Sequence, residues 1–157
     1  MKLFFMGLGS NMGDSKSIIE QAVAMMGERL GEVVACSSFY QSVAQGYTSD
    51  NLYINAVVAL RSDLQPHALL AATQQIERDM GCDRHRNDDG TYCDRLLDID
   101  MIACDDMVCN DATLILPHPR MHERLFVLEP MCEIAAEWQH PLLHLTADEL
   151  RQALLGS

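Results

Sequence analysis

The sequence predicts an α/β fold in which four strands form an antiparallel sheet with helices packed on its face. The first observation is the order of the segments, strand, helix, strand, strand, helix, strand, followed by further helices. The second is the length of 157 residues, which fits a single domain over 1–157 and can bury a core without disulfides. The third is an apolar content of 48%, which is typical of a globular protein.

The first half of the chain supplies three of the strands and one helix. Residues 2–8 predict a buried strand, and the turn-forming Gly9-Ser10-Asn11 ends it. A helix is predicted over 15–29 because apolar residues recur there at helical spacing, at Ile19, Val23, Met26 and Leu30. Residues 32–42 and 52–61 are rich in β-branched and aromatic residues, which favours strands.

The second helix and the last strand follow. We expect Asp63 to cap a helix that has Pro66 in its first turn and that ends at Gly81. The apolar stripe of this helix is Leu69, Thr73, Ile76 and Met80. The polar residues 82–94 predict an exposed loop, and residues 95–104 predict a strand.

The C-terminal part of the chain adds helices to this core. They are expected near 126–136 and 146–154, and Thr146 and Glu149 fit a capping box at the start of the second. The complete order is therefore βαββαβ plus C-terminal helices, which is the ferredoxin-like pattern. Many functions occur on this fold, so function has to be argued from individual residues.

Charge and hydropathy exclude several classes of partner. The formal net charge is −12, whereas non-specific binding to nucleic acid requires a basic face. No apolar run reaches the roughly 18 residues that span a bilayer, and the N-terminus does not have the pattern of a signal peptide. We therefore expect a cytoplasmic protein with no nucleic-acid or membrane partner, and separately we expect a monomer.

The six cysteines agree with that location. None forms a Cys-x-x-Cys pair, and no His-x-x-x-His spacing accompanies them, so their spacing does not predict a zinc site. Reduced, mostly structural thiols are the expected state.

Asp98 and Asp100 are the first candidate functional residues. Side chains alternate between the faces of a strand, so both carboxylates point the same way, about 6.5 Å apart, while Leu97, Ile99 and Met101 point toward a core. Two close carboxylates repel each other, and Mg²⁺, which prefers oxygen ligands, would offset this repulsion. Two ions could share the pair and hold a phosphoryl group. A solvated strand face with two ordinary aspartates fits the same pattern.

Arginines are concentrated around this pair of aspartates. Arg95 precedes it directly, and Arg84 and Arg86 lie in the predicted loop. The guanidinium group matches phosphate oxygens with two parallel hydrogen bonds, and a loop that carries such groups could close over phosphates. A charged loop that is merely soluble has the same composition.

The helix before this loop carries a second stripe, formed by Leu70, Gln74 and Glu77. Its polar members could line a pocket, or the stripe could face solvent. In the strand over 52–61, Asn55 is unusual because asparagine is depleted in strands. Its amide could bind the edge of a heterocycle, which needs donors and an acceptor together, or it could have an internal partner.

Several isolated residues could also contact a ligand. Tyr53 and Phe126 could stack on a flat ring, although isolated aromatics are often found in cores. In the cation-rich segment 117–124, His118, Arg120 and Arg124 could contact phosphates, or His118 could only fix a turn. No P-loop is present, since no Gly-Lys-Ser/Thr follows the glycines near the N-terminus.

Taken in order, six segments resemble the 6-hydroxymethyl-7,8-dihydropterin pyrophosphokinase family. Each is short, but their joint order and spacing are specific and extend over nearly the whole chain. The segments are Leu8-Gly9-Ser10-Asn11, Ser37-Ser38-Phe39-Tyr40, Tyr53-Ile54-Asn55-Ala56, Gln74 to Glu77, Asp94 to Asp100 and Leu116 to Arg124.

The resemblance implies a ferredoxin-like fold and a specific reaction. The pyrophosphoryl group of ATP is transferred to the hydroxymethyl oxygen of 6-hydroxymethyl-7,8-dihydropterin, which gives AMP and the pterin diphosphate in folate biosynthesis. It also implies that Asp98 and Asp100 hold two Mg²⁺ ions and form the catalytic group together with Arg84, Arg86 and Arg95. Catalysis would come from positioning and electrostatics, and no residue stands out as a general base.

The resemblance also implies two binding sites. The residues implied at the nucleotide are Leu70, Gln74, Arg84, Arg86, Tyr92, Arg95, Met101, His118 and Arg124. Those implied at the pterin are Ser42, Val43, Gln45, Tyr53, Asn55 and Phe126.

The chain departs from the family pattern mainly in the segment 82–94. This loop is lengthened, which shifts the match of Arg84 and Arg86, and Tyr92 stands where a tryptophan is common. Cys93-Asp94 replaces a common Gly-Pro, and Pro119 replaces a tyrosine. Two other functions stay open: a non-catalytic ferredoxin-like module that binds nucleotide or pterin, and another Mg²⁺-dependent kinase or nucleotidyltransferase.

Overall fold

The computed structural model describes residues 1–11, 14–42, 53–81 and 96–156. Its elements confirm the predicted βαββαβ order followed by C-terminal helices. They are β1 (Lys2–Ser10), α1 (Ser15–Arg29), β2 (Glu32–Cys36), β3 (Tyr40–Ser42), β4 (Tyr53–Ser62), α2 (Pro66–Asp79), β5 (Asp98–Cys104), β6 (Cys109–Asn110), β7 (Ile115–Leu116), a 3₁₀ turn (Met121–Glu123), α3 (Leu125–Ala135) and α4 (Ala147–Leu155).

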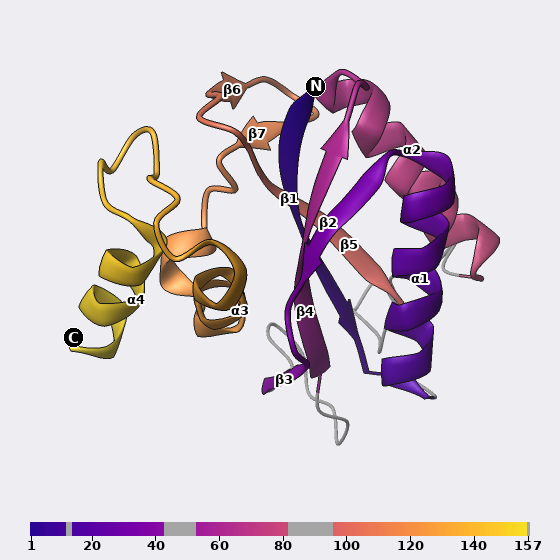
Figure 1. Cartoon of the computed structure of the whole chain (residues 1–157), viewed down its shortest axis with the longest axis horizontal. Coiled ribbons are helices and arrows are strands. Elements are labelled where there is room, and N and C mark those ends of the chain that lie inside the picture. Colours follow the sequence, from indigo (N-terminus) through magenta and orange to yellow (C-terminus); the bar gives the residue numbers. More distant parts are fainter. Residues whose placement is uncertain (12–13, 43–52, 82–95, 157) are drawn as a thin grey trace.

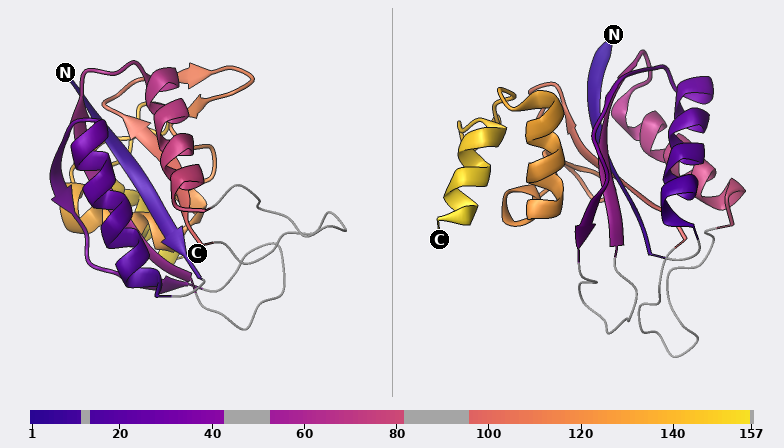
Figure 2. Two further views of the ribbon diagram at one scale, coloured as in Figure 1. Left: turned by 90° about the vertical axis from the view of Figure 1, so that its right-hand side faces the viewer. Right: turned by 60° about the horizontal axis from the view of Figure 1, so that its bottom comes forward.

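The strands form a sheet with the order β2-β4-β1-β5, in which all neighbours are antiparallel. The short β3 pairs with β4 beside β2. Helices α1 and α2 cover one face of the sheet, and α3 covers the other, with α4 packed against α3 (Figures 1 and 2). The sheet is therefore the middle of three layers, as in the predicted ferredoxin-like fold.

Two hydrophobic cores explain why β1 is apolar almost throughout. Phe4, Met6 and Leu8 pack with residues of α1 and α2, whereas Phe5 packs with residues of α3 and α4. A strand in the middle of a sheet with helices on both faces has to be apolar on both sides. The polar positions that interrupt this pattern therefore need another explanation.

These polar positions gather on one half of the face that α3 covers. In the other half of that face, Val57 and Ala59 pack against α3. Toward the far end of the same strands, the ladder places Asn55 opposite Gly9, and it places Asp98 and Asp100 opposite Gly9 and Gly7. Because the glycines carry no side chains, neighbouring side chains approach them closely, Ile102 beside Gly7 and Asn55 beside Gly9, and polar groups line this half of the sheet.

The segment 32–42 is not the single strand that its composition predicts. It divides into β2 and β3 because serine side chains take over backbone hydrogen bonds at the break. The Ser37 hydroxyl accepts from the Val57 N–H and donates to the Ser38 carbonyl. The Ser38 N–H then donates to the Glu133 carboxylate on α3 at 2.9 Å.

The start of α2 also differs from the prediction. The residue before the helix is Gln65, with no side-chain cap, and Pro66 opens the first turn. Asp63 does not cap the helix, because its carboxylate lies 3.8 Å from the N-terminal ammonium of Met1. The predicted end is confirmed: Gly81 has a φ of 93°, a left-handed conformation that glycine adopts readily.

The C-terminal helices are confirmed with shifts of one residue. The Thr146 side chain accepts from the Glu149 N–H, and the Glu149 carboxylate accepts from the Thr146 N–H, so the predicted capping box is present. The predicted loop over 82–94 and the first residues of the predicted strand over 95–104 lie outside the described residues. Within the described part of the chain, no helix is both long and apolar enough to cross a membrane.

Candidate active site

Asp98 and Asp100 lie on the face of β5 that is turned away from α1 and α2. Ile99 and Met101 are buried in the opposite core, with 6% and 5% exposure, while both aspartates are half-buried. The predicted alternation of this strand is therefore confirmed. Two neighbouring carboxylates repel each other where solvent is partly excluded, and a cation offsets this repulsion. Oxygen donors of this kind fit Mg²⁺.

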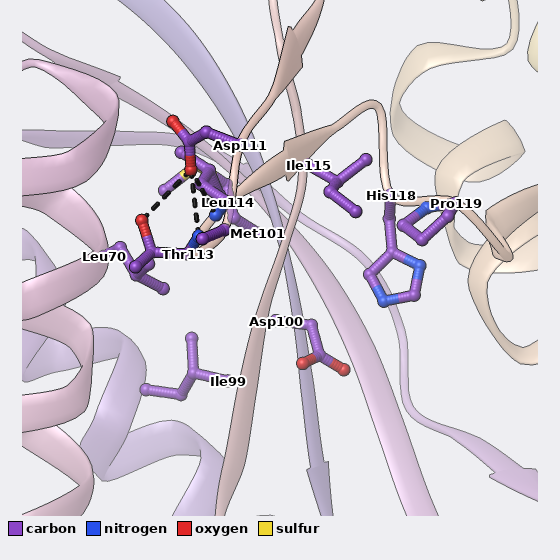
Figure 3. A pocket seen from close by; sticks show the side chains of 11 residues that line it. Leu70, Ile99, Asp100, Met101, Asp111, Thr113, Leu114, Ile115, His118 and Pro119 are labelled. Carbon is purple, nitrogen blue, oxygen red and sulfur yellow. Dashed lines mark hydrogen bonds between the residues drawn. The ribbon is translucent and has the colours of Figure 1, made fainter.

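A pocket of about 280 Å³ opens beside Asp100 (Figure 3). This volume is close to the lower end of the range of roughly 300–1,000 Å³ for small-molecule sites. Three of the predicted nucleotide-binding residues meet here: Leu70 from α2, Met101 from β5 and His118. The other residues that line it are Ile99, Asp111, Ala112, Thr113, Leu114, Ile115 and Pro119. The walls are largely apolar and a few polar groups converge on them, which suits the base of a nucleotide.

The hairpin formed by β6 and β7 contributes much of this pocket, and the sequence analysis missed it. Asp111 shapes its turn, because one carboxylate oxygen accepts from the N–H groups of Thr113 and Leu114, both at 2.9 Å. These hydrogen bonds lower the pKa of the Asp111 carboxyl. An aspartate that bonds to backbone N–H groups two or three residues on is a known turn signal, so Asn110-Asp111 could have indicated the turn.

His118 is held as a neutral imidazole at the edge of the pocket. Its Nδ1 accepts from the Arg120 N–H at 3.2 Å, so the ring proton of the neutral form lies on Nε2. Burial first, and then the positive charges of Arg124 and Arg120, lower the pKa of His118 to about 4, although Asp98 opposes this. His118 therefore fixes its turn and also lines the pocket, and its contact with phosphates stays a prediction.

The acidic range therefore provides a test of His118. We expect its imidazole to titrate at about 4, below the ordinary value of 6.5, in a nuclear magnetic resonance titration. The pKa of His118 is lower in the folded than in the unfolded protein. Its contribution to the free energy of unfolding is therefore complete above pH 6.5 and is lost as the pH falls toward 4. Arg124→Ala should raise the pKa, and Arg61→Ala on β4 should leave it unchanged. If the pKa of His118 were unchanged in Arg124→Ala, the charge of Arg124 would not contribute to the lowered pKa.

Arg124 and Phe126 lie against each other at the start of α3. The guanidinium carbon of Arg124 is 5.5 Å from the centroid of the Phe126 ring, a cation–π arrangement. The buried Nε of Arg124 has no hydrogen-bond partner within the described structure. A buried N–H without an acceptor is destabilising, so this donor suits an anion such as a phosphate oxygen. Phe126 was expected at the pterin, and that role stays a prediction.

Asn55 lies buried at the end of the sheet where β3 joins β4, with 7% exposure. Its amide nitrogen donates to the Ser42 hydroxyl at 2.8 Å and to the Tyr40 carbonyl at 3.4 Å. The internal partner that was one of two alternatives is therefore present. Ser42 also pairs with Tyr53 in the ladder, so three of the predicted pterin residues are brought together.

Only one of the remaining predicted site residues lies within the described residues. Gln74 is exposed on α2 and does not line the pocket. The others lie outside the described residues, and their roles stay predictions: Val43, Gln45, Arg84, Arg86, Tyr92 and Arg95.

Glu77 corrects the sequence analysis, which placed it in a polar pocket or in solvent. It is buried, with 8% exposure, and its carboxylate accepts from the Ile99 N–H at 2.8 Å. Strand β5 lies at the edge of the described sheet, so its outer N–H groups need acceptors from elsewhere. Glu77 supplies one of them from α2 and fixes the strand on which Asp98 and Asp100 lie.

Glu77→Ala is therefore expected to reduce stability. It leaves the Ile99 N–H without this acceptor, which should lower the free energy of unfolding by about 1–3 kcal/mol in urea denaturation. Glu77→Gln keeps an acceptor oxygen and should lose clearly less. Equal losses in both variants would show that the charge of Glu77, and not this hydrogen bond, is what stabilises β5.

Comparison with known proteins identifies the family of this chain. The sequence matches the family described as 7,8-dihydro-6-hydroxymethylpterin-pyrophosphokinase (HPPK) over residues 5–136. The 2-amino-4-hydroxy-6-hydroxymethyldihydropteridine pyrophosphokinase of Porphyromonas gingivalis is 39% identical over 142 residues, which cover 90% of this chain and 95% of the relative. The protein of the same name from Bacillus subtilis is 36% identical, over 85% of this chain and 78% of the relative.

Solved structures share the fold. The crystal structure of wild-type Plasmodium falciparum HPPK-DHPS with STZ-DHP has a TM-score of 0.81 at 13% identity, and covers 99% of this chain. This chain spans only 43% of that longer protein, so the likeness establishes the fold alone. The family match, by contrast, includes most of the chain, and the relatives are similar along most of their own length. The chain therefore belongs to the 7,8-dihydro-6-hydroxymethylpterin-pyrophosphokinase family.

Proposed function

We propose that this chain transfers the pyrophosphoryl group of ATP to the hydroxymethyl oxygen of 6-hydroxymethyl-7,8-dihydropterin, releasing AMP, in folate biosynthesis. Family membership and the names of the relatives support an ATP-dependent transferase of this kind. The observation that carries the proposal is the position of two aspartates, side by side on one strand face, with Asp100 lining a pocket of about 280 Å³.

Each part of the site has a task in this reaction. Asp98 and Asp100 would hold two Mg²⁺ ions, which neutralise charge on the triphosphate when bound. The apolar walls formed by Leu70 and Met101 would bind the base of ATP. The Nε2–H of His118 and the buried Nε of Arg124 would donate to phosphate oxygens, which orients the chain of phosphates toward the aspartates.

The pterin would lie at the other side of the aspartates, over the glycines of β1. Asn55 would bind its edge as an acceptor through Oδ1, since its amide nitrogen donates to Ser42 and Tyr40 and these contacts hold the amide in one orientation. Tyr53, Ser42 and Phe126 would complete this side. The resemblance further supports contacts from residues outside the described part of the chain, at Val43, Gln45, Arg84, Arg86, Tyr92 and Arg95, and from Gln74 on α2.

We also expect a monomeric, cytoplasmic protein that forms one domain and binds neither nucleic acid nor membrane. The net charge of −12 supports the absence of nucleic-acid binding. If the protein is a monomer, light scattering should give a mass of 17.5 kDa that does not change with protein concentration.

One assay tests the proposed reaction. The protein is mixed with ATP, Mg²⁺ and 6-hydroxymethyl-7,8-dihydropterin, and the nucleotides and pterins are separated by chromatography. AMP together with a diphosphorylated pterin supports the proposal. ADP with a monophosphorylated pterin would indicate a simple kinase instead, and bound nucleotide without turnover would indicate a binding module.

A further inference from the structure

His67, Cys109 and Asp111 form a cluster where the start of α2 meets the hairpin of β6 and β7. The Nε2 of His67 lies 2.8 Å from Oδ2 of Asp111, and the Sγ of Cys109 lies 3.6 Å from the same oxygen. Within residues 1–11, 14–42, 53–81 and 96–156, this is the one group of three His, Cys, Asp or Glu side chains whose ligand atoms all lie within 4.8 Å of one another. We propose that this cluster is a second metal site, which binds Zn²⁺ or a similar transition-metal ion.

The chemistry of the three donors selects the class of ion. Mg²⁺ and Ca²⁺ prefer sites made of oxygen atoms, as at Asp98 and Asp100. An imidazole, a thiolate and a carboxylate together are instead typical of Zn²⁺ and its neighbours in the transition series. Three protein ligands leave the fourth tetrahedral position open to water or to an exchangeable ligand.

The distances fit such an ion after small movements. Bond lengths of about 2.0–2.3 Å in a tetrahedral zinc site place ligand atoms roughly 3.3–3.6 Å apart. The contact between Cys109 and Asp111, at 3.6 Å, already agrees with this. His67 and Asp111 would separate by about half an ångström to reach it. Their side chains are 52% and 45% exposed, so solvent and not packing surrounds much of them.

The surroundings hold Asp111 in the orientation that the site needs. Its Oδ1 accepts from the N–H groups of Thr113 and Leu114, which leaves Oδ2 turned toward His67 and Cys109. Outer hydrogen bonds of this kind orient metal ligands in many proteins. In the metal-free protein, the Cys109 thiol donates a hydrogen bond to Asp111. When the metal ion binds, the thiol loses this proton to solvent and the resulting thiolate coordinates the ion.

The position of the site gives the ion a structural effect. It would connect α2, through His67, to a hairpin that lines the pocket with Thr113 and Leu114. Asp111 and Asp100 lie well apart along this pocket (Figure 3), so the two metal sites are separate. The ion would fix the wall of the pocket, whereas the aspartates of β5 face the phosphates.

Cobalt binding to the chelator-treated full chain tests the site. Co²⁺ takes the place of Zn²⁺ and gives a thiolate-to-metal charge-transfer band only where a cysteine is a ligand. We expect this band to appear at one equivalent, to disappear when Zn²⁺ is added and to be absent in Cys109→Ser. His67→Ala and Asp111→Asn should each weaken binding at least about tenfold. Zn²⁺ should also raise the Tm of the unchanged protein but not that of Cys109→Ser.

Two control variants test whether cobalt binds at this site and not at another thiol or at the aspartates of β5. Cys36→Ser removes another exposed thiol, and Asp98→Asn alters the proposed magnesium site; both should keep the band and its affinity. Circular dichroism checks that every variant is folded. A band that persists in Cys109→Ser, or that is lost in Cys36→Ser, would overturn the proposal. So would cobalt affinity that is unchanged in both His67→Ala and Asp111→Asn.

Discussion

Asp98→Ala and Asp100→Ala are each expected to abolish pyrophosphoryl transfer while the fold remains intact. Both side chains lie on a half-buried strand face, and neither belongs to the two hydrophobic cores. Removing either carboxylate would remove a ligand of the proposed Mg²⁺ ions, so we expect the rate of AMP formation to fall by at least about 10³-fold. Circular dichroism should show that both variants remain folded, because neither side chain contributes to the two hydrophobic cores.

Asp106→Ala is the matched control for these variants. Asp106 is an exposed aspartate in the turn directly after β5, so its removal changes net charge equally without altering the site. Its rate should equal that of the unchanged protein. Near-normal turnover in either Asp98→Ala or Asp100→Ala would contradict the metal assignment, and equal loss in Asp106→Ala would point to a general effect of charge.

Arg124→Ala is expected to lower kcat/KM for ATP by about 10²–10³-fold, the usual effect of removing one preorganised donor to a developing charge. The buried Nε of Arg124 has no partner within the described structure, so a small shift of the side chain that brings this donor to an anion would be favourable. Its charge also lies close enough to His118 to lower the pKa of that imidazole. Steady-state kinetics with varied ATP measure the effect.

Two further variants separate charge from geometry. Arg124→Lys keeps the charge but loses the planar fork, so it should recover only part of the rate. Arg61→Ala removes an exposed arginine at the end of β4, whose partner is Glu32, and should leave kinetics unchanged. If Arg124→Ala lowered Tm but left kcat/KM unchanged, Arg124 would have only a structural role, through its contact with Phe126, and no role toward ATP.

Much of the fold could be predicted because it depends on local patterns. The helix over 15–29 and the capping box of Thr146 and Glu149 follow from apolar spacing and terminal residues, which act over a few positions. The break within 32–42 could not be predicted in this way. It depends on Ser38 meeting Glu133 across 95 residues of sequence, and no local pattern records that contact.

That Asp98 and Asp100 share a face could be predicted from the sequence, since the period of a strand is two residues whatever surrounds it. The family could be predicted too, because the order and spacing of several short motifs are specific together. The groups that surround those aspartates, however, depend on how the whole chain folds. Folding brought the hairpin over the pocket, buried Glu77 under β5 and placed His67 beside Cys109 and Asp111. These contacts join residues far apart in the chain, and their partners are selected by packing and not by spacing.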